Sequence, residues 1–233
     1  MKDKGAIAIL GGMGPEASAK MLEVMVSMAT REFNAKNGDD FPEIIVDSIP
    51  IPDFISNRKN LPLATKILIV RVKQLQALNI SQFAIACNTA HILLDVLSST
   101  SSTPFVSMID AVANEAASRG IKSAGLLATP STIKSGLYQN ALKPLGIEII
   151  LPSGRQLAEI EQVIRRVISG TNSTLDSNKL VKIASSLKQK GAQAIILGCT
   201  ELPLAFPKET GLPVFNSIEI LSRTLLKQFF MKQ

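Results

Sequence analysis

The chain has no tryptophan, one tyrosine, one histidine and two cysteines among its 233 residues. Two cysteines cannot build the disulfide framework of a small secreted domain. The net charge of +6 is not gathered into a long run of Lys and Arg, and few aromatic rings are present for base stacking, so nucleic-acid binding is not favoured. Apolar runs such as Ala6–Leu10 are too short for a membrane span or a signal peptide. We therefore expect a cytoplasmic protein with reduced thiols and with no nucleic-acid or membrane partner.

The composition is that of an ordinary folded protein. Hydrophobic residues make up 46% of the chain and charged residues 19%. At roughly 150 residues per domain, the length corresponds to between one and two domains. A chain of this size can bury a sizeable core without disulfides or metals.

Short apolar runs alternate with longer segments that have helical periodicity. The expected strands span Ala6–Leu10, Glu43–Ser48, Gln82–Ala86, Pro104–Ser107, Ser123–Ala128, Ile147–Leu151, Gln193–Gly198 and Pro213–Asn216. The expected helices span Pro15–Asn34, Pro62–Leu78, Ala90–Leu97, Asp110–Ser118, Ser131–Leu142, Arg155–Ile168, Ser177–Lys190 and Ile218–Lys232. Ser131 and Ser177 are expected N-caps. The strands are apolar throughout, which is typical of parallel strands covered on both faces and predicts an α/β fold.

The sequence repeats itself in order. The matching pairs of segments are Ile7–Met13 with Ala124–Pro130, Phe83–Thr89 with Ile195–Glu201, and Pro104–Asp110 with Pro213–Glu219. Three matches in order indicate a duplication. We expect two pseudo-symmetric α/β halves, each a four-stranded, mainly parallel sheet flanked by helices. The first half comprises residues 1–110 with the C-terminal helix 217–233, and the second comprises residues 111–216. The halves are expected to face each other across a cleft that holds the active site.

Cys87 and Cys199 occupy equivalent places in the two halves. Each ends an expected strand, and each precedes polar residues. Ligands of open α/β sheets bind at the carboxyl ends of the strands. Two thiols on opposite walls of a cleft would suit inversion of a stereocentre, with one thiolate removing a proton and the other thiol returning one. A helix N-terminus can lower the pKa of a thiol into the range where the thiol can both take up and release a proton.

Other interpretations of the cysteines remain open from the residues alone. A free cysteine is often a small buried hydrophobe. Cys87 and His91 have a helical spacing that could ligate zinc, but few further soft ligands are present, so we expect no metal.

At these residues the sequence resembles the aspartate/glutamate racemase family, whose members are pyridoxal-independent and use two cysteines. The segments that carry the resemblance are Gly11–Glu16, Ala86–His91, Leu127–Thr132 and Gly198–Pro203. The resemblance implies a homodimer that needs no cofactor and holds an amino acid between Cys87 and Cys199. It further implies that the substrate is bound by Met13, Asn88, Thr89, Thr129, Thr200 and Glu201. Glu201 could instead receive the substrate ammonium.

One position departs from the family pattern. Aspartate racemases of this family typically carry an arginine after a Pro-Asp pair, where it grips the side-chain carboxylate of the substrate. Here Phe54 stands in that place, and phenylalanine cannot make a bidentate contact. Arg58 is the expected substitute, and Arg165 or Arg166 is a further candidate. Glutamate or a less acidic amino acid therefore stays open as the substrate.

Further motifs have competing interpretations. Gly12–Ala17 fits the pattern of a dinucleotide-binding turn, but the acidic residue usually found about twenty positions later is missing. His91 could donate to substrate, tune the thiol or serve only as a bonded helix residue. Tyr138 is expected to be a packed aromatic residue.

The sequence therefore predicts a cofactor-independent amino-acid racemase with Cys87 and Cys199 as its two bases. The alternatives are a related cysteine-dependent isomerase, hydantoin racemase or decarboxylase on the same scaffold, or a non-catalytic amino-acid sensor.

Overall fold

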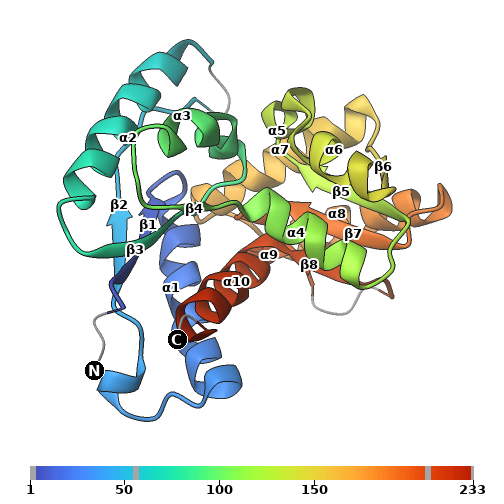
Figure 1. Cartoon of the computed structure of the whole chain (residues 1–233). Coiled ribbons are helices and arrows are strands. Elements are labelled where there is room, and N and C mark those ends of the chain that lie inside the picture. The colour runs from blue at the N-terminus through green and yellow to red at the C-terminus, as the bar shows by residue number, and fades with distance from the viewer. Residues whose placement is uncertain (1–3, 55–57, 208–210, 232–233) are drawn as a thin grey trace. The chain divides into compact units, whose positions relative to one another are not determined.

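The computed structural model describes residues 4–54, 58–207 and 211–231 (Figure 1). The chain divides into two compact units, of which unit 1 comprises Met1–Met108 with Ile218–Gln233 and unit 2 comprises Ile109–Ser217. Within the described residues each unit holds one four-stranded sheet, and all strand pairings are parallel. The predicted α/β class with two parallel sheets is confirmed.

Unit 1 is built around the first sheet. Its strands are β1 (Ala6–Gly11), β2 (Ile44–Ser48), β3 (Ile80–Ile85) and β4 (Phe105–Val106). Its helices are α1 (Pro15–Phe33), α2 (Leu61–Leu75), α3 (Leu94–Ser98) and, from the end of the chain, α10 (Ser217–Met231). Short 3-10 turns are η1 (Gly38–Asp40), η2 (Arg58–Asn60) and η3 (Thr89–Leu93).

Unit 2 repeats this plan with the second sheet. Its strands are β5 (Ser123–Ala128), β6 (Glu148–Ile150), β7 (Ala194–Gly198) and β8 (Val214–Asn216). Its helices are α4 (Met108–Ser118), α5 (Pro130–Ser135), α6 (Leu137–Leu142), α7 (Gly154–Ile168), α8 (Thr174–Gln189) and α9 (Leu202–Ala205), and η4 spans Lys143–Leu145.

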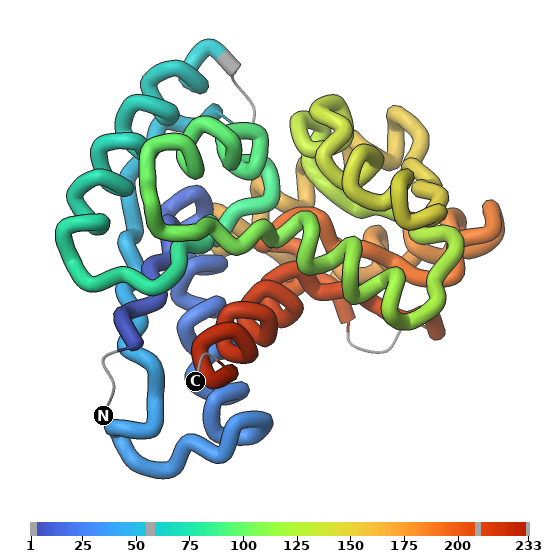
Figure 2. The backbone as a smooth tube through the Cα atoms, in the orientation of Figure 1, coloured from blue at the N-terminus to red at the C-terminus, as the bar shows by residue number. Residues whose placement is uncertain are grey.

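The two sheets have the same strand order. It is β2-β1-β3-β4 in unit 1 and β6-β5-β7-β8 in unit 2. Figure 2 traces the backbone by colour from the N-terminus to the C-terminus. In both sheets the second strand of the unit pairs with one side of the first strand, and the third strand pairs with the other side. Doubly wound sheets bind ligands at this switch point, beyond the carboxyl ends of the two central strands. The functional search therefore centres on the residues that follow β1 and β3, and on those that follow β5 and β7.

Alternation along the strands of unit 1 explains why helices cover both faces of its sheet. Ala8 and Leu10 of β1 pack in one cluster with Leu68 of α2. Ile7 and Ile9 belong to the opposite cluster, which includes Met21, Met25 and Met28 of α1 together with Leu221 and Leu225 of α10. Successive side chains of a strand point to opposite faces, so a strand buried on both sides is apolar at every position.

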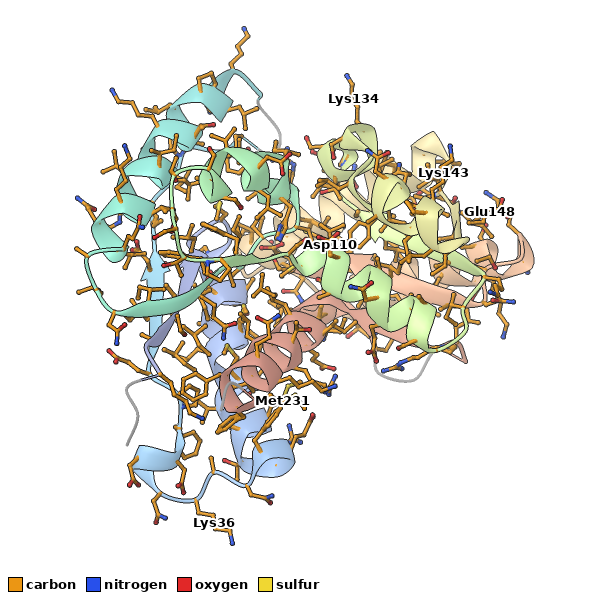
Figure 3. All side chains as sticks on the ribbon, in the orientation of Figure 1. Lys36, Asp110, Lys134, Lys143, Glu148 and Met231 are labelled. Carbon is orange, nitrogen blue, oxygen red and sulfur yellow. The ribbon has the colours of Figure 1, made fainter. Side chains whose placement is uncertain are left out.

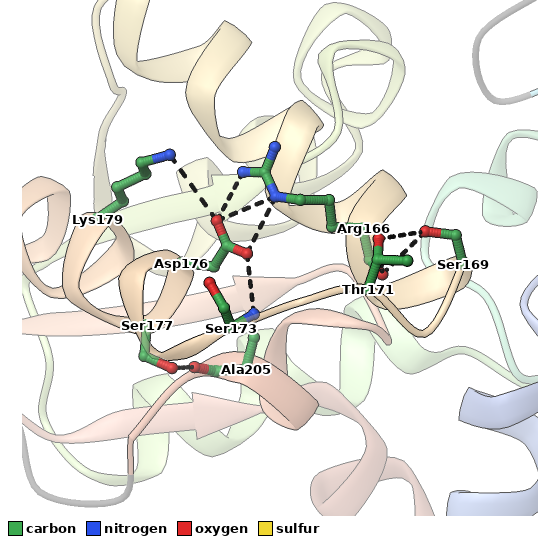
Figure 4. Close-up of polar contacts among 8 residues, drawn as sticks. All are labelled: Arg166, Ser169, Thr171, Ser173, Asp176, Ser177, Lys179 and Ala205. Atoms are coloured by element: carbon green, nitrogen blue, oxygen red, sulfur yellow. Dashed lines mark hydrogen bonds and ion pairs between the residues drawn. The ribbon is translucent and has the colours of Figure 1, made fainter.

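Unit 2 shows the same burial around β7. Ile195 and Leu197 pack with α7 and α8 residues such as Ile160 and Leu180. The two helices are further joined by an ion pair in which Arg166 of α7 contacts Asp176 of α8, with the shortest N–O distance 2.6 Å (Figure 4). Ser177 of α8 donates a hydrogen bond to the carbonyl of Ala205 in α9. This network holds α9 against α8.

The structure corrects several expected element boundaries. The helix expected over Ser131–Leu142 is broken at Gly136, which has φ 73° and separates α5 from α6. The N-cap of α5 is Thr129 and not Ser131, and the N-cap of α8 is Ser173 and not Ser177. The short helix α9 was not predicted.

No helix in the described part of the chain is long and apolar enough to cross a membrane.

Candidate active site

The turn after β1 brings the backbone close to its neighbours. Gly12 has φ +87°, and a Cβ placed there would lie 2.2 Å from the carbonyl oxygen of Ile49. The Gly12 N–H donates to Ser18 Oγ over 3.0 Å, and Ser18 Oγ donates to the carbonyl of Gly14. The turn is thus closed by a side chain from the first turns of α1. It places Met13, which is buried, just past the end of β1.

Cys87 lies next to this turn within unit 1. Leu10 of β1 pairs with Ile85 of β3, and the Ala86 N–H donates to the Leu10 carbonyl over 2.9 Å, so Cys87 follows directly at the carboxyl edge of the sheet. Cys87 is 3% exposed and belongs to one packed cluster with Met13 and Phe54. The predicted binding residues Asn88 and Thr89 follow it at the start of η3, and both are buried.

His91 holds the segment after Cys87. The Met108 N–H donates to His91 Nε2 over 2.9 Å, and His91 Nδ1 lies 2.8 Å from the carbonyl oxygen of Cys87. Since Nε2 accepts a hydrogen bond, Nδ1 carries the proton and donates to that carbonyl. Both ring nitrogens are therefore engaged within unit 1. His91 positions the Cys87 backbone, and the ring does not offer a nitrogen to zinc or to substrate.

The equivalent edge of the sheet in unit 2 has different polar side chains next to its cysteine. Ala128 of β5 pairs with Gly198 of β7, so Thr129 and Cys199 follow their strands side by side. The Thr129 hydroxyl accepts a hydrogen bond from the Thr132 N–H over 3.1 Å and donates to Thr132 Oγ1 over 3.0 Å. Thr129 thus caps α5, and its hydroxyl proton is already directed to a protein acceptor.

Glu201 binds the second cysteine directly. The Cys199 thiol donates to Glu201 Oε2 over 2.9 Å, and the Thr200 hydroxyl donates to the same oxygen over 3.1 Å. Cys199 is 4% exposed and Glu201 is 3% exposed. The carboxyl group is therefore a buried acceptor for both preceding side chains. The family resemblance implies that Glu201 lines the site, but the two-residue spacing from Cys199 does not indicate a contact with the thiol.

Tyr138 packs against Gly198, the residue before the second cysteine. A Cβ on Gly198 would lie 2.9 Å from the Tyr138 ring, so glycine is needed for this close approach. Burial raises the pKa of the Tyr138 hydroxyl far above its usual range, and the nearby Cys199 adds to that shift. A phenol with such a raised pKa stays protonated, which agrees with the expected packing role.

The basic residues considered for substrate binding have other partners or lie outside the described part. Arg166 is committed to Asp176, and this hydrogen bond together with the charge of Arg166 lowers the pKa of the Asp176 carboxyl (Figure 4). Arg165 is exposed and pairs with Glu161 at 2.9 Å. Arg58 begins η2, and its side chain lies outside the described residues. Phe54, in the place of the family arginine, is 2% exposed.

The competing motifs gain no support from the geometry. Asp47, the acidic residue near the end of β2, is held in a two-point ion pair by Arg71 at 2.6 and 2.7 Å. It is therefore not placed as the ribose acceptor of a dinucleotide site. Among the described residues no group of three His, Cys, Asp or Glu side chains is arranged to hold a metal ion.

Comparison with known proteins identifies the scaffold. A sequence profile described as Asp/Glu/hydantoin racemase matches residues 10–225. The chain belongs to the Asp/Glu/hydantoin racemase family. As a member it is an isomerase of the amino-acid racemase type. The matched stretch contains both cysteines and the polar residues that follow them.

Relatives of this racemase span nearly its full length. The broad specificity amino-acid racemase RacX of Bacillus subtilis (strain 168) is 25% identical over 97% of this chain and 99% of its own. The crystal structure of an aspartate racemase homologue from Pyrococcus horikoshii OT3 is 29% identical and has a TM-score of 0.82, covering 97% of this chain and 99% of that one. The aspartate racemase of Picrophilus torridus is 28% identical with a TM-score of 0.83, covering 97% and 95%.

Proposed function

We propose that this racemase inverts the α-carbon of a free amino acid with Cys87 and Cys199 as its two acid–base groups. In one direction a thiolate removes the α-proton and forms the S–H bond while the C–H bond breaks. The other thiol then delivers its proton to the opposite face of the carbon. Over one turnover the α-carbon loses one proton and gains one, and the two cysteines end with their protonation states exchanged. The reverse direction starts from that exchanged state.

The observation that carries the proposal is the pair of buried thiols at matching strand ends. Each of Cys87 and Cys199 follows the third strand of its sheet, next to the turn that follows the first strand. Duplicated thiols at duplicated switch points are what a two-base reaction requires. The names of the relatives, which include aspartate racemases and a broad specificity amino-acid racemase, support an amino acid as the substrate.

The polar groups after each cysteine suit the charge that develops during the reaction. Removal of the α-proton moves negative charge onto the substrate carboxylate, and preorganised donors stabilise that charge. We place the carboxylate against Asn88, Thr89, Thr129 and Thr200, with Met13 and Glu201 beside it. Because the Thr129 and Thr200 hydroxyls donate to protein acceptors, their backbone N–H groups are the donors we assign at these two positions.

The proposal also bears on where the protein works. Both cysteines are free thiols, and a mechanism that needs both favours a reducing compartment such as the cytoplasm. We assign no cofactor to the reaction, since two thiols supply its proton transfers.

A direct test treats the purified protein with hydroxylamine and a chelator, and then follows the conversion of L-amino acids by chiral chromatography. We expect conversion to persist after the treatment and to disappear in Cys87→Ala and Cys199→Ala variants. Activity that is lost on treatment and restored by pyridoxal phosphate would contradict the mechanism. Tight binding of amino acids with no change at the α-carbon would instead indicate a sensor.

A further inference from the structure

The peptide of Cys87 lies between two regular elements of unit 1. The strand β3 ends at Ile85, and the 3-10 turn η3 begins at Thr89. Cys87 belongs to neither of them. Its carbonyl oxygen lies 2.8 Å from Nδ1 of the buried His91. This contact comes from a side chain and lies outside the regular hydrogen-bond pattern of the sheet, so a change at one residue can remove it.

The other side of the His91 ring contacts the last residue of unit 1. The Met108 N–H donates to His91 Nε2 over 2.9 Å. Met108 is the first residue of α4, and the chain enters unit 2 at the next residue (Figure 1). The first N–H groups of a helix find no acceptor within that helix, and His91 supplies one. The ring therefore joins the Cys87 peptide to the point where the chain leaves unit 1.

The anchor at Met108 is buried in the core of unit 1. Its side chain is in one cluster with Ala86, the residue before Cys87, and with Ile218, where the chain re-enters unit 1. The Met108 side chain is 0% exposed. A close-packed interior holds its backbone in place. Met108 is thus a fixed point against which the His91 ring can hold the Cys87 peptide.

The matching position of unit 2 holds a residue that cannot make this contact. The alignment of Phe83–Thr89 with Ile195–Glu201 places Pro203 opposite His91. Proline has no side-chain donor or acceptor. Unit 2 nevertheless forms a sheet with the same strand order as that of unit 1. A unit of this fold therefore forms without the histidine, which favours a role for His91 in the reaction.

Given the proposed racemase function, we propose that His91 is a positioning residue, which holds the Cys87 peptide against Met108 so that the thiol keeps its direction for proton transfer. Transfer rates depend steeply on small displacements of the reacting groups. His91 exchanges no proton with the substrate, since its Nδ1–H donates to one backbone group and its Nε2 accepts from another. It acts through the backbone of Cys87.

Three variants separate the two hydrogen bonds of the ring. His91→Asn places an amide near the position of Nδ1 and can keep the bond to the Cys87 carbonyl. His91→Gln reaches the position of Nε2 and can keep the bond from Met108, while His91→Phe keeps a ring and removes both. We expect kcat of His91→Phe to fall about 10- to 100-fold with KM within about twofold. His91→Asn should stay within about fivefold of the wild-type kcat, and His91→Gln should recover little.

A primary deuterium isotope effect shows whether the loss acts through Cys87. The substrates are the α-deuterated D- and L-forms of whichever of aspartate, glutamate, asparagine and methionine the wild type racemises fastest. Slower transfer at Cys87 makes that step more rate-limiting. In His91→Phe the isotope effect on kcat/KM should rise for the enantiomer that Cys87 deprotonates and fall for the other. The residual exchange of a Cys87→Ser variant identifies the enantiomer that Cys199 deprotonates.

A matched control removes a different buried hydrogen bond from unit 1. Gln82 of β3 is buried, and its Nε2 donates to the Leu225 carbonyl of α10 over 3.0 Å. Gln82→Leu therefore loses a buried bond on the same strand that leads to Cys87. We expect both isotope effects of this variant to equal those of the wild type.

The outcomes separate this inference from the proposed function. Isotope effects that stay at the wild-type values in the His91 variants, or that change alike for both enantiomers, would overturn the role of His91 and leave the racemase function standing. If His91→Phe does not fold, the two amide variants give the same comparison, and failure of all three to fold would assign His91 to stability alone. A wild type that racemises none of the four amino acids would overturn the proposed function itself.

Discussion

The two thiols of this racemase have unequal neighbours. Cys199 donates to the buried carboxyl of Glu201, which also accepts from Thr200. In the other unit the residue two positions after Cys87 is Thr89, so no carboxyl occupies the equivalent position. The duplicated segments therefore keep the thiol but differ in what holds its proton. This difference makes Glu201 the residue most suited to a test of positioning.

Glu201→Gln keeps the size of the side chain and removes its negative charge. We expect kcat/KM to fall about 10- to 100-fold, the value of a hydrogen bond to a charged group, with the fold intact. A change in the pH profile of kcat should accompany the loss, which a purely structural role would not produce. Glu148→Gln is the matched control, because Glu148 is exposed on β6 and should leave activity unchanged (Figure 3).

At the scale of elements, the turn between β1 and α1 sets the edge where Met13 and Cys87 lie. Gly12 has a left-handed φ of +87°, and its missing Cβ leaves room for the Ile49 backbone. Both features require glycine.

Gly12→Ala should lower the free energy of unfolding by more than about 3 kcal/mol, because backbone strain and a clash with Ile49 add together. Gly170→Ala provides the comparison, since Gly170 has φ +67° with nothing within 4 Å of the added Cβ. It should cost only about 1 kcal/mol. Denaturant unfolding of both variants measures the difference, and equal losses would show that the close approach to Ile49 does not matter.

The pairing of α7 with α8 predicts a pH dependence. Hydrogen bonding to Arg166 lowers the pKa of Asp176 below its ordinary value of 3.8, so the pair stabilises the fold above that value and the stability is lost as pH falls through the lowered pKa. Asp176→Asn should therefore lower the free energy of unfolding by about 2–3 kcal/mol at neutral pH. This value is smaller than that for a fully buried ion pair because Arg166 is partly exposed.

The same experiment has an internal control. Lys179 approaches Asp176 only to 3.9 Å and is 46% exposed, so Lys179→Ala should change stability by less than about 0.5 kcal/mol. The difference in unfolding free energy between the wild type and Asp176→Asn should become smaller in acid. A difference that stays constant down to the acid-unfolding range would refute the role of the ionised pair.

Much of the element layout could be predicted because the strands are buried on both faces. β5 spans Ser123–Ala128 as expected, since its apolar run is bounded by polar residues. The break at Gly136 was missed, because a glycine inside a helical pattern does not show whether its φ is positive. The cap at Thr129 was missed because Ser131 is an equally good cap by residue type. The Cys199–Glu201 contact depends on side-chain rotamers, which spacing along the chain does not fix.

At the scale of the whole molecule, the repeated strand order is the clearest trace of duplication. The sequence showed three matched segments, and both sheets share one topology in the described residues. The homodimer implied by the family resemblance remains a prediction. Light scattering of the purified protein should give a mass twice the 25.0 kDa of one chain. A monomer mass that persists at high protein concentration would contradict it.

The central claim is that each cysteine works on one face of the same α-carbon. The most direct test incubates the D- and L-forms of one substrate separately in heavy water with Cys87→Ser and Cys199→Ser variants. Racemisation should fall by about a thousandfold in both, in line with the loss of an acid–base group. Any remaining α-deuterium exchange should proceed without inversion and favour one enantiomer in the first variant and the other enantiomer in the second. Racemisation at the wild-type rate in either variant, or exchange of the same enantiomer by both, would contradict the account.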